Sequence, residues 1–454
     1  MSKITVKYDP TLTIESIEQP MYATSKNENE ADYAEEVQQT KIDGILVPLV
    51  KVNNINIFWD KITKFELSST GFLPQLTFTF KDDLDFTRSL DAPGNDNLVL
   101  VQILPPFDEA YKKINLRFFI ENVKIVGQNV TIFAKYNVNN LYQSQLKAFG
   151  ELSTYEYFDK IATECQLGYA TNIDSTEDKR YRYIRNNTYL SSLENDIHFS
   201  GTDRCILDSW IDYHNYLILC DIYERYNANE SDLKVWTSPS NIPDTETDSE
   251  PTPKEVDAIL TNSINDRTSQ LFISAYTIKN NAGKSIKSGT DKVLESYDMN
   301  KNENFSTLIQ DGDIKKDTFI KSVYMGEMFG EYDYFLGNTC RTAYMQKINS
   351  NTVEVSLATP LLGLERGQRV NLKWYETNEI TNKIKEQNQI ETNIPDSEED
   401  TTDGDLQTLN KQVSGQYLII GTTIKFSGVS RGWNYILTLS RPADKINNYI
   451  SNDK

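Results

Sequence analysis

Short stretches of alternating apolar and polar residues follow one another from about residue 42. They are ILVPLVKV, NINIFW, ITKFELSS, LPQLTFTF, LVLVQIL, LRFFIENVKIV and NVTIFAKY. Leu76, Phe78 and Phe80 alternate with Thr77 and Thr79, the period-2 pattern of a strand with one buried face. Turn-forming sequences separate the stretches: SSTG at 68–71, APGNDN at 92–97 and VGQN at 126–129. The pattern predicts a β-sandwich or barrel over residues 42–150.

The hydrophobic period changes at residue 151. Ser153 and Glu156 form a capping-box pattern, and Tyr157, Phe158, Ile161, Ala162 and Cys165 give the apolar stripe of a helix. We expect Gly168 to cap its C-terminus. Farther on, Thr202 and Asp203 predict the start of a helix running to about 214, with Ile206, Trp210, Tyr213 and Leu217 facing a core. The apolar run 216–223 predicts a central buried strand. Residues 151–236 are therefore expected to form a small α/β domain.

A second series of strand-like segments begins near residue 268 and continues to the closing segment WNYILTLS. Polar insertions interrupt it at about 280–317 and 378–413, and such insertions belong at strand ends on the surface. Residues 1–41 are polar and acidic and predict an extended arm or a disordered leader; residues 237–262 predict an acidic, Pro-containing linker or a long exposed loop. The expected fold is mainly β with a smaller α/β part. Two tube-like β-barrel or sandwich domains, at 42–150 and 263–454, flank the α/β domain, and their similar lengths suggest a duplication.

Composition narrows the classes of function. The 454 residues contain 46 Lys and Arg against 66 Asp and Glu, a formal charge of −20, and 26 Tyr and 19 Phe suit β-structure. A chain this acidic is not expected to wrap around nucleic acid or to bind an anionic membrane surface. No apolar run is long enough to span a bilayer, and the N-terminus does not resemble a secretory signal.

Candidate chemistry concentrates in residues 198–220, which contain both histidines of the chain, His198 and His214, and two of its four cysteines, Cys205 and Cys220. No CxxC, HxxxH or HExxH spacing occurs, and on the predicted helix Cys205 and His214 point to opposite faces. Cys165 and Cys220 are expected to be core residues. The sequence therefore predicts no metal ligand, no catalytic residue and no cofactor site.

Other signatures of enzymes are also missing. The sequence contains no GxSxG, no GxxxxGK[ST] and no GxGxxG. The acidic runs DDLDF at 82–86 and SEED at 397–400 are candidates for paired catalytic carboxylates only through their proximity, and DTETDSE lacks the spacing of a Ca²⁺ loop. We expect these runs to be solvated and the protein not to be an enzyme.

Three segments carry a resemblance to a known family. They are LSTYEYFDKIATECQLGYATNI; the stretch with Asp203, Trp210 and Asp212–Tyr213 followed by LILCDIYE; and the C-terminal series VEVSLATPLLGLERGQRVNLKWY, GQYLIIGTTIKFSG and WNYILTLSRP. In this order they resemble the central baseplate hub proteins of contractile-tailed bacteriophages, including the late-control protein D group and the N-terminal part of VgrG spike proteins. The acidic leader and the two insertions depart from that pattern.

The resemblance implies a homotrimer whose six β-barrels form a ring in the virion tail baseplate, assembled in the host cytoplasm. Such a hub adapts the sixfold tail tube to the threefold spike. Its implied partners are the tail tube or tube-initiator protein, the central spike protein, the surrounding baseplate wedge proteins, and DNA passing through the lumen during ejection without specific binding. Because the chain is acidic, we expect an acidic lumen. The alternatives are a tail-associated glycan-binding or glycan-cleaving protein and the hub of a phage-derived contractile injection system.

Overall fold

A computed structural model gives the fold of the chain. It describes residues 4–17, 22–23, 45–53, 55–82, 97–104, 113–176, 178–198, 206–227, 234–236, 255–257, 259–261, 273–280, 291–298, 303–310, 319–323, 345, 349, 351–357, 364–376, 408–410, 413–430 and 432–441. The fold is mainly β with a smaller α/β part, as predicted. In this described part, no helix is long and apolar enough to cross a membrane.

The first β-domain contains the strands that the alternating pattern predicts. They are β3 (Ile45–Leu46), β4 (Leu49–Val52), β5 (Ile55–Ile57), β6 (Ile62–Ser69), β7 (Gln75–Lys81), β8 (Leu98–Ile103), β9 (Ile114–Val126) and β10 (Asn129–Tyr136), with the short helices η1 (Trp59–Lys61) and α2 (Asn139–Tyr142). Leu76, Phe78 and Phe80 are buried, whereas Thr77 and Thr79 lie on the opposite face of β7. Gly127 takes a φ of 61° in the tight turn between β9 and β10.

The beginning of the N-terminal arm is extended. Strand β1 (Thr5–Tyr8) pairs with β12 (Gly168–Thr171), and the chain then runs along the first β-domain, where the backbone N–H of Ile17 donates to Gln102. The short strand β2 (Tyr22–Ala23) pairs with β3.

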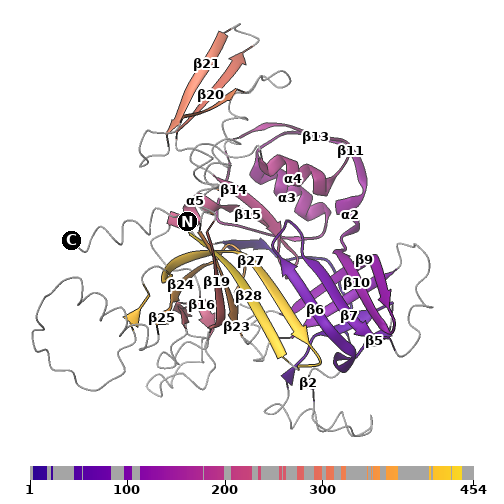
Figure 1. The fold of residues 1–454 in the computed structure, drawn as a ribbon. Helices are drawn as coiled ribbons and strands as arrows, with labels where there is room; N and C mark the ends of the chain where they lie inside the picture. Colours follow the sequence, from indigo (N-terminus) through magenta and orange to yellow (C-terminus); the bar gives the residue numbers. More distant parts are fainter. Residues whose placement is uncertain are drawn as a thin grey trace, which may run out of the picture.

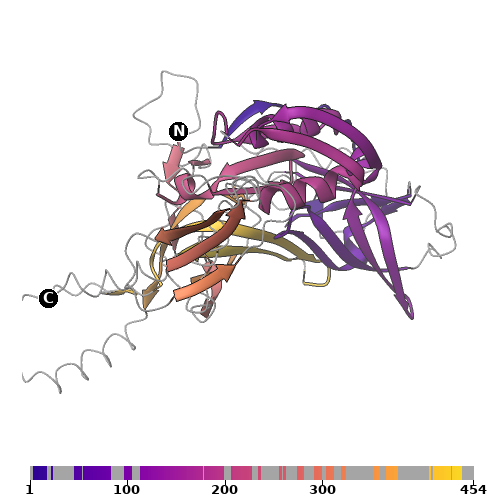
Figure 2. The ribbon, with the colours of Figure 1, turned by 90° about the horizontal axis from the view of Figure 1, so that it is seen from above.

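The middle unit is an α/β layer that lies across both β-domains (Figures 1 and 2). Its sheet has the order β1-β12-β15-β14, and a ribbon of β11 and β13 accompanies the helices. The elements are β11 (Ser144–Leu152), α3 (Thr154–Glu164), β13 (Arg180–Thr188), α4 (Tyr189–His198), β14 (Leu207–Ile211), β15 (Tyr216–Asp221) and α5 (Ile222–Asn227). The predicted capping box is present, since Ser153 and Glu156 each accept the other's backbone N–H.

Two local predictions are wrong. Residues 207–211 form strand β14 and not a helix, because this segment is buried along its whole length and pairs antiparallel with the central strand β15. Gly168 is not a helix cap: α3 ends at Glu164 with Cys165 as its C-cap, and Gln166 takes the left-handed conformation with a φ of 59°. Gly168 instead begins β12, where a Cβ atom would lie 2.4 Å from the Tyr216 ring.

The second β-domain is built from β18 (Ile259–Thr261), β19 (Ile273–Asn280), β23 (Asn351–Leu357), β24 (Arg369–Lys373), β27 (Gly415–Ser427) and β28 (Gly432–Arg441). Short pairs accompany it: β16 (Lys234–Trp236) with β17 (Glu255–Asp257), and β25 (Tyr375–Glu376) with β26 (Thr408–Leu409). Strands β17 and β18 fall within the predicted linker. The predicted insertion 280–317 contains β20 (Asp291–Asp298) and β21 (Glu303–Gln310), which with β22 (Phe319–Val323) form a small sheet that stands apart from the body in Figure 1.

The two β-domains share one sheet of 13 strands, in which β27 of the second domain pairs with β6 of the first. Within this sheet the domains correspond strand by strand. The order β6-β7-β10-β9-β8 of the first domain matches β19-β23-β28-β27-β24 of the second. Strands β6 and β19 both have 8 residues, and β9 and β27 both have 13.

The bulges follow the same correspondence. Pairing is interrupted at Thr63 in β6 and at Ser274 in β19, each the second residue of its strand. It is also interrupted at Glu121 in β9 and at Ile420 in β27. Matching strand order, lengths and bulges agree with the duplication that the domain lengths suggested.

Candidate functional site

Of the soft side chains of residues 198–220, the structure describes His198, His214 and Cys220, and these three lie in different elements: α4, the turn 212–215 and β15. Cys220 is buried in β15, and Cys165 is buried at the end of α3, where burial raises the pKa of its thiol to about 12. His198 ends α4, and Cys205 lies outside the described residues. Among the residues that the structure describes, no three His, Cys, Asp or Glu side chains gather as metal ligands would. The acidic runs 83–86 and 397–400 also lie outside them.

The turn between β14 and β15, residues 212–215, is instead a structural joint. One oxygen of Asp212 accepts the backbone N–H groups of His214 at 2.9 Å and Tyr216 at 2.8 Å, and Asn215 takes a φ of 66°. Asp and Asn tolerate such turns because their short side chains bond to nearby backbone. The Asn215 side chain in turn receives the buried Tyr136 hydroxyl at 2.6 Å, which fixes the turn against the first β-domain.

His214 bridges the two β-domains from this turn. Its Nδ1 lies 3.2 Å from the backbone oxygen of Lys113, and its Nε2 lies 2.6 Å from a carboxylate oxygen of Glu365. Since both partners are acceptors, both ring nitrogens must carry a proton, so the ring is an imidazolium. Burial alone lowers the pKa of His214, but the Glu365 carboxylate outweighs it and raises that pKa to about 9.

Tyr213 reaches the seam where β27 pairs with β6. Its hydroxyl lies 3.2 Å from the backbone oxygen of Leu67 and 3.0 Å from that of Thr422, and it accepts the Thr422 hydroxyl at 3.1 Å. The side chain is buried. The middle unit therefore holds together the strands through which the two β-domains meet.

The loop before β24 docks on the other side of the joint. The Arg366 guanidinium donates to the backbone oxygen of Gly71 at 2.7 Å and to Asp208 at 2.8 Å, and it lies 4.6 Å from the Trp210 ring centroid. Arg225 donates to the backbone oxygen of Gly367 at 2.8 Å. All three parts of the chain thus meet within a few residues of 212–215 and 365–367.

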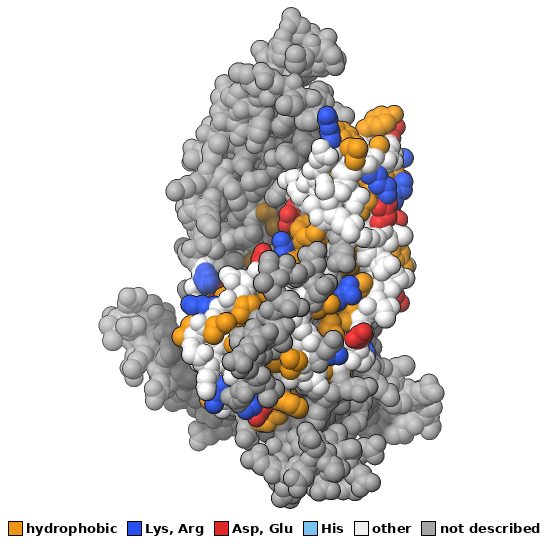
Figure 3. Space-filling model, turned by 90° about the vertical axis from the view of Figure 1, so that its right-hand side faces the viewer, with side chains coloured by type: hydrophobic (Ala, Val, Ile, Leu, Met, Phe, Trp, Pro, Cys, Tyr) orange, Lys and Arg blue, Asp and Glu red, His pale blue; other side chains and the backbone are white. Residues whose placement is uncertain are grey.

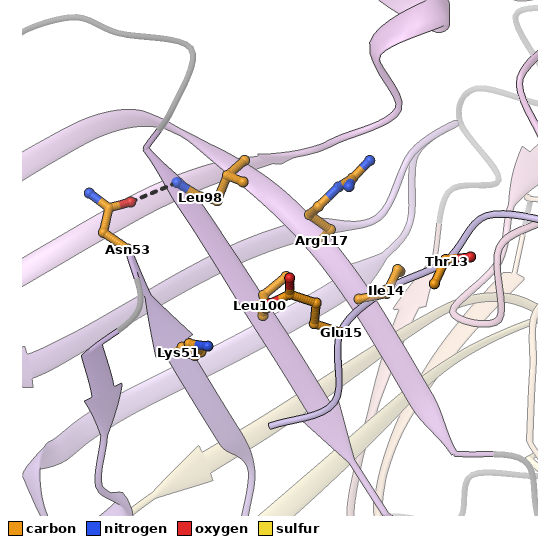
Figure 4. A pocket seen from close by; sticks show the side chains of 8 residues that line it. All are labelled: Thr13, Ile14, Glu15, Lys51, Asn53, Leu98, Leu100 and Arg117. Carbon is orange, nitrogen blue, oxygen red and sulfur yellow. Dashed lines mark hydrogen bonds between the residues drawn. The ribbon is translucent and has the colours of Figure 1, made fainter. Parts of the chain in front are cut away.

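A pocket of about 370 Å³ opens between the N-terminal arm and the first β-domain (Figure 4). Its walls are Thr13, Ile14, Glu15, Lys51, Asn53, Leu98, Leu100 and Arg117. Asn53 is engaged with the backbone N–H of Leu98 at 2.8 Å, and the Arg117 Nε is buried without a hydrogen bond. Glu15 is the one carboxylate among these described lining residues, so they do not supply the paired carboxylates that most glycoside hydrolases use.

The solvent face of the shared sheet is basic. We call the outward-facing, paired positions of β6, β7, β10, β19, β23, β27, β28 and the end of β9 the lysine face. It carries six lysines and two glutamates: Lys64, Lys81, Lys124, Lys135, Lys279, Lys425, Glu66 and Glu354. Glu66 pairs with Lys64 at 3.4 Å and with Lys425 at 3.5 Å, and Glu354 pairs with Lys279. Threonines occupy many of the remaining positions.

Comparison with known proteins places the chain by fold. No family model and no curated protein sequence matches it. Among solved structures it is similar to the 43 kDa tail protein of prophage MuSo2 from Shewanella oneidensis, with a TM-score of 0.50 and 11% identity over 87% of this chain and 98% of that one. It also matches a tail protein of Neisseria meningitidis MC58 (0.47, 11%, 87% and 96%) and the half-lidded Francisella PdpA–VgrG complex (0.46, 9%, 90% and 62%). The chain thus has the fold of a phage tail protein.

Sequence reasoning recognised residues 203–221 as architectural but missed what they contact. The sequence pattern marks Asp212, Tyr213 and Trp210 as structural positions. Glu365 and Arg366 lie within the C-terminal strand series, whose pattern does not distinguish them from their neighbours. The usable signal was turn chemistry, since DYHN places an Asp and an Asn around a two-residue turn.

Proposed function

We propose that the protein is the central hub of a phage tail baseplate: a trimer that forms a ring, adapts the sixfold tail tube to the threefold spike, and lines the channel through which DNA leaves. The observation that carries the proposal is the pair of corresponding β-domains joined in one sheet. Three such chains present six similar β-domains, which suits a sixfold partner on one side, while the remainder of each chain keeps threefold symmetry.

The likeness in fold to a prophage tail protein supports this role. Its partners would be the tube or tube-initiator protein, the spike and the surrounding wedge proteins, in a contractile-tailed virion. A role without catalysis fits the joint, whose polar groups are engaged with one another and with backbone. The pocket under the N-terminal arm does not favour a glycan-cleaving enzyme, because its described walls contain a single carboxylate.

In this arrangement the barrel cores face away from the channel, so the lysine face lines it. On these strands the lining would then be basic and not acidic as the composition led us to expect, because lysines outnumber glutamates on them. Ion pairs with Glu66 and Glu354 neutralise part of the charge.

The oligomeric state tests the proposal. Light scattering on the purified chain should give three times the mass of one chain, and electron microscopy should show a ring with a central channel. A monomer at micromolar concentration would overturn the hub.

A further inference from the structure

The seam within one chain shows how two β-domains of this type join. Strand β27 pairs antiparallel with β6, placing Ile424 opposite Leu67 and Lys425 opposite Glu66. Only the part of β27 beyond its bulge takes part, since the part before it pairs with β24. At the centre of the seam Ile424 is 1% exposed and Leu67 is 0% exposed.

The corresponding edges at the other ends of the domains are free within the described residues. Strand β8 pairs only with residues 114–119 of β9, so the end of β9 beyond its bulge has an open edge. Strand β19 pairs with β23 on one side, and it ends the 13-stranded sheet on the other. These two edges correspond to the two that meet in the seam.

Counting from the bulges gives the register. Ile424 stands four residues after the bulge at Ile420, and Ile125 stands four residues after the bulge at Glu121. Leu67 likewise stands four residues after the bulge at Thr63, as Ile278 does after that at Ser274. The counterparts of the central pair Ile424–Leu67 are therefore Ile125 and Ile278.

These two isoleucines are exposed where their counterparts are buried. Ile125 is 54% exposed and Ile278 is 52% exposed, and Val126 beside Ile125 is 62% exposed. An edge strand with bare isoleucines and unpaired backbone groups is a site for pairing with another chain. Within the chain, the edge at Leu67 is covered by the end of β27. The counterpart of that strand end is the end of β9, so the partner that fits the edge at Ile278 is the end of β9 from a second copy.

We propose that the end of β9 in one copy pairs antiparallel with β19 of a second copy, with Ile125 opposite Ile278 and Val126 opposite Thr277. This pairing deepens the proposed function and rests on its trimer: seams within and between chains then alternate around the ring. Lys124 comes to lie opposite Lys279, whose ammonium group is already paired with Glu354. In the seam within the chain, this position is occupied by Thr423 and Ser68, with hydroxyl oxygens 3.4 Å apart.

Cysteine cross-linking tests the register. Residues directly opposite on antiparallel strands have Cα atoms about 4.5–5.5 Å apart, within the range of a disulfide. The full chain carrying both Ile125→Cys and Ile278→Cys should form covalent dimers and trimers under mild oxidation, seen on non-reducing gels. The wild-type chain, with its native cysteines, and the chain with Ile125→Cys and Tyr181→Cys should not form them, because Tyr181 lies on the β11–β13 ribbon.

A second variant measures the contribution of the pairing. Ile278→Asp places a charge at the centre of the seam, and we expect loss of the trimer at micromolar concentration with an unchanged circular dichroism spectrum. Tyr181→Asp, at a site 77% exposed, should keep the trimer.

The outcomes separate this pairing from the hub itself. A wild-type trimer in which the double-cysteine chain stays uncross-linked, or in which Ile278→Asp has no effect, overturns the pairing and leaves the trimer intact. A covalent ladder that continues beyond three chains supports the pairing and overturns the trimer. A monomeric wild-type chain overturns both.

Discussion

Raising the pH should weaken the joint at His214. The pKa of this imidazole rises from 6.5 to about 9 on folding, since the Glu365 carboxylate outweighs the effect of burial. The folded state therefore holds the proton more tightly than the unfolded state. The contribution to stability is fully present below about pH 6.5 and is lost as the pH rises through about 9.

The magnitude follows from that difference. One pKa unit corresponds to about 1.4 kcal/mol, so the full loss is on the order of 3 kcal/mol. Both side chains are shielded, with 9% of His214 and 22% of Glu365 exposed, so solvent screening reduces the figure little. Burial and the nearby Glu365 also raise the pKa of Asp212, from 3.8 to about 7, so the contribution of this group to stability is lost as the pH rises through about 7. Above about pH 7 most of the Asp212 contribution is already lost, so the remaining pH dependence comes mainly from His214.

The assay is urea unfolding followed by fluorescence at several pH values between about 7 and 10, for the wild type and His214→Gln. Glutamine keeps a hydrogen-bonding side chain but does not titrate. Because part of the contribution is already lost at pH 7, the stability advantage of the wild type over the variant should shrink between about pH 7 and 10 by roughly 2.5 kcal/mol. An advantage that stays constant across this range would refute the ion pair as its source.

Three further substitutions test the joint and the middle unit by the same unfolding assay. Tyr213→Phe removes the hydroxyl at the β27–β6 seam and should cost about 1–3 kcal/mol, whereas Tyr181→Phe, at an exposed ring, should stay within about 0.5 kcal/mol; equal effects would contradict the role of the seam hydroxyl. Ser153→Ala removes the cap of α3 and should cost about 1 kcal/mol, and no loss would contradict the capping box. Gly367→Ala combines a φ of 84° with a Cβ atom 2.8 Å from the Trp210 ring, and it should lower the melting temperature clearly; an unchanged melting temperature would show that this approach is not tight.

Strands such as β6, β7 and β10 could be predicted from the sequence because each has one buried and one solvated face. Alternation in β7 reflects a physical asymmetry that stays local, with Phe78 inside and Thr79 outside. The capping box at Ser153 is local for the same reason, since it involves only four consecutive residues. Such features need no knowledge of distant partners.

Strand β14 was mispredicted because its environment is not local. Residues 207–211 are buried on both faces, so no period of 2 appears, and the spacing of Ile206, Trp210 and Tyr213 imitates a helix. The contacts that stabilise a strand at this position are the pairing with β15 and the hydrogen bond between Asp208 and Arg366. Arg366 is 158 residues away from Asp208 in the sequence. For the same reason Glu365 could not be recognised as the partner of His214.

The correspondence between the β-domains was also hidden from sequence. ITKFELSS and ISAYTIKN share the alternation of any half-buried strand, and they become counterparts only through the bulge at the second residue and the position in the sheet. Once the two strands are aligned in this way, Ile278 and Leu67 occupy equivalent positions. Leu67 is buried because β27 pairs with its strand, and Ile278 is exposed because no described strand pairs with that edge of β19.

The charge of the lysine face differs in sign from the net charge of the chain. A formal charge of −20 led to the expectation of an acidic lumen, yet the lysine face carries three lysines for each glutamate. If this face lines the channel, phosphates passing it would meet threonines and lysines, three of which are paired with glutamates, so contacts would be weak, numerous and screened by salt. The net charge of the chain therefore says little about the charge of this one face.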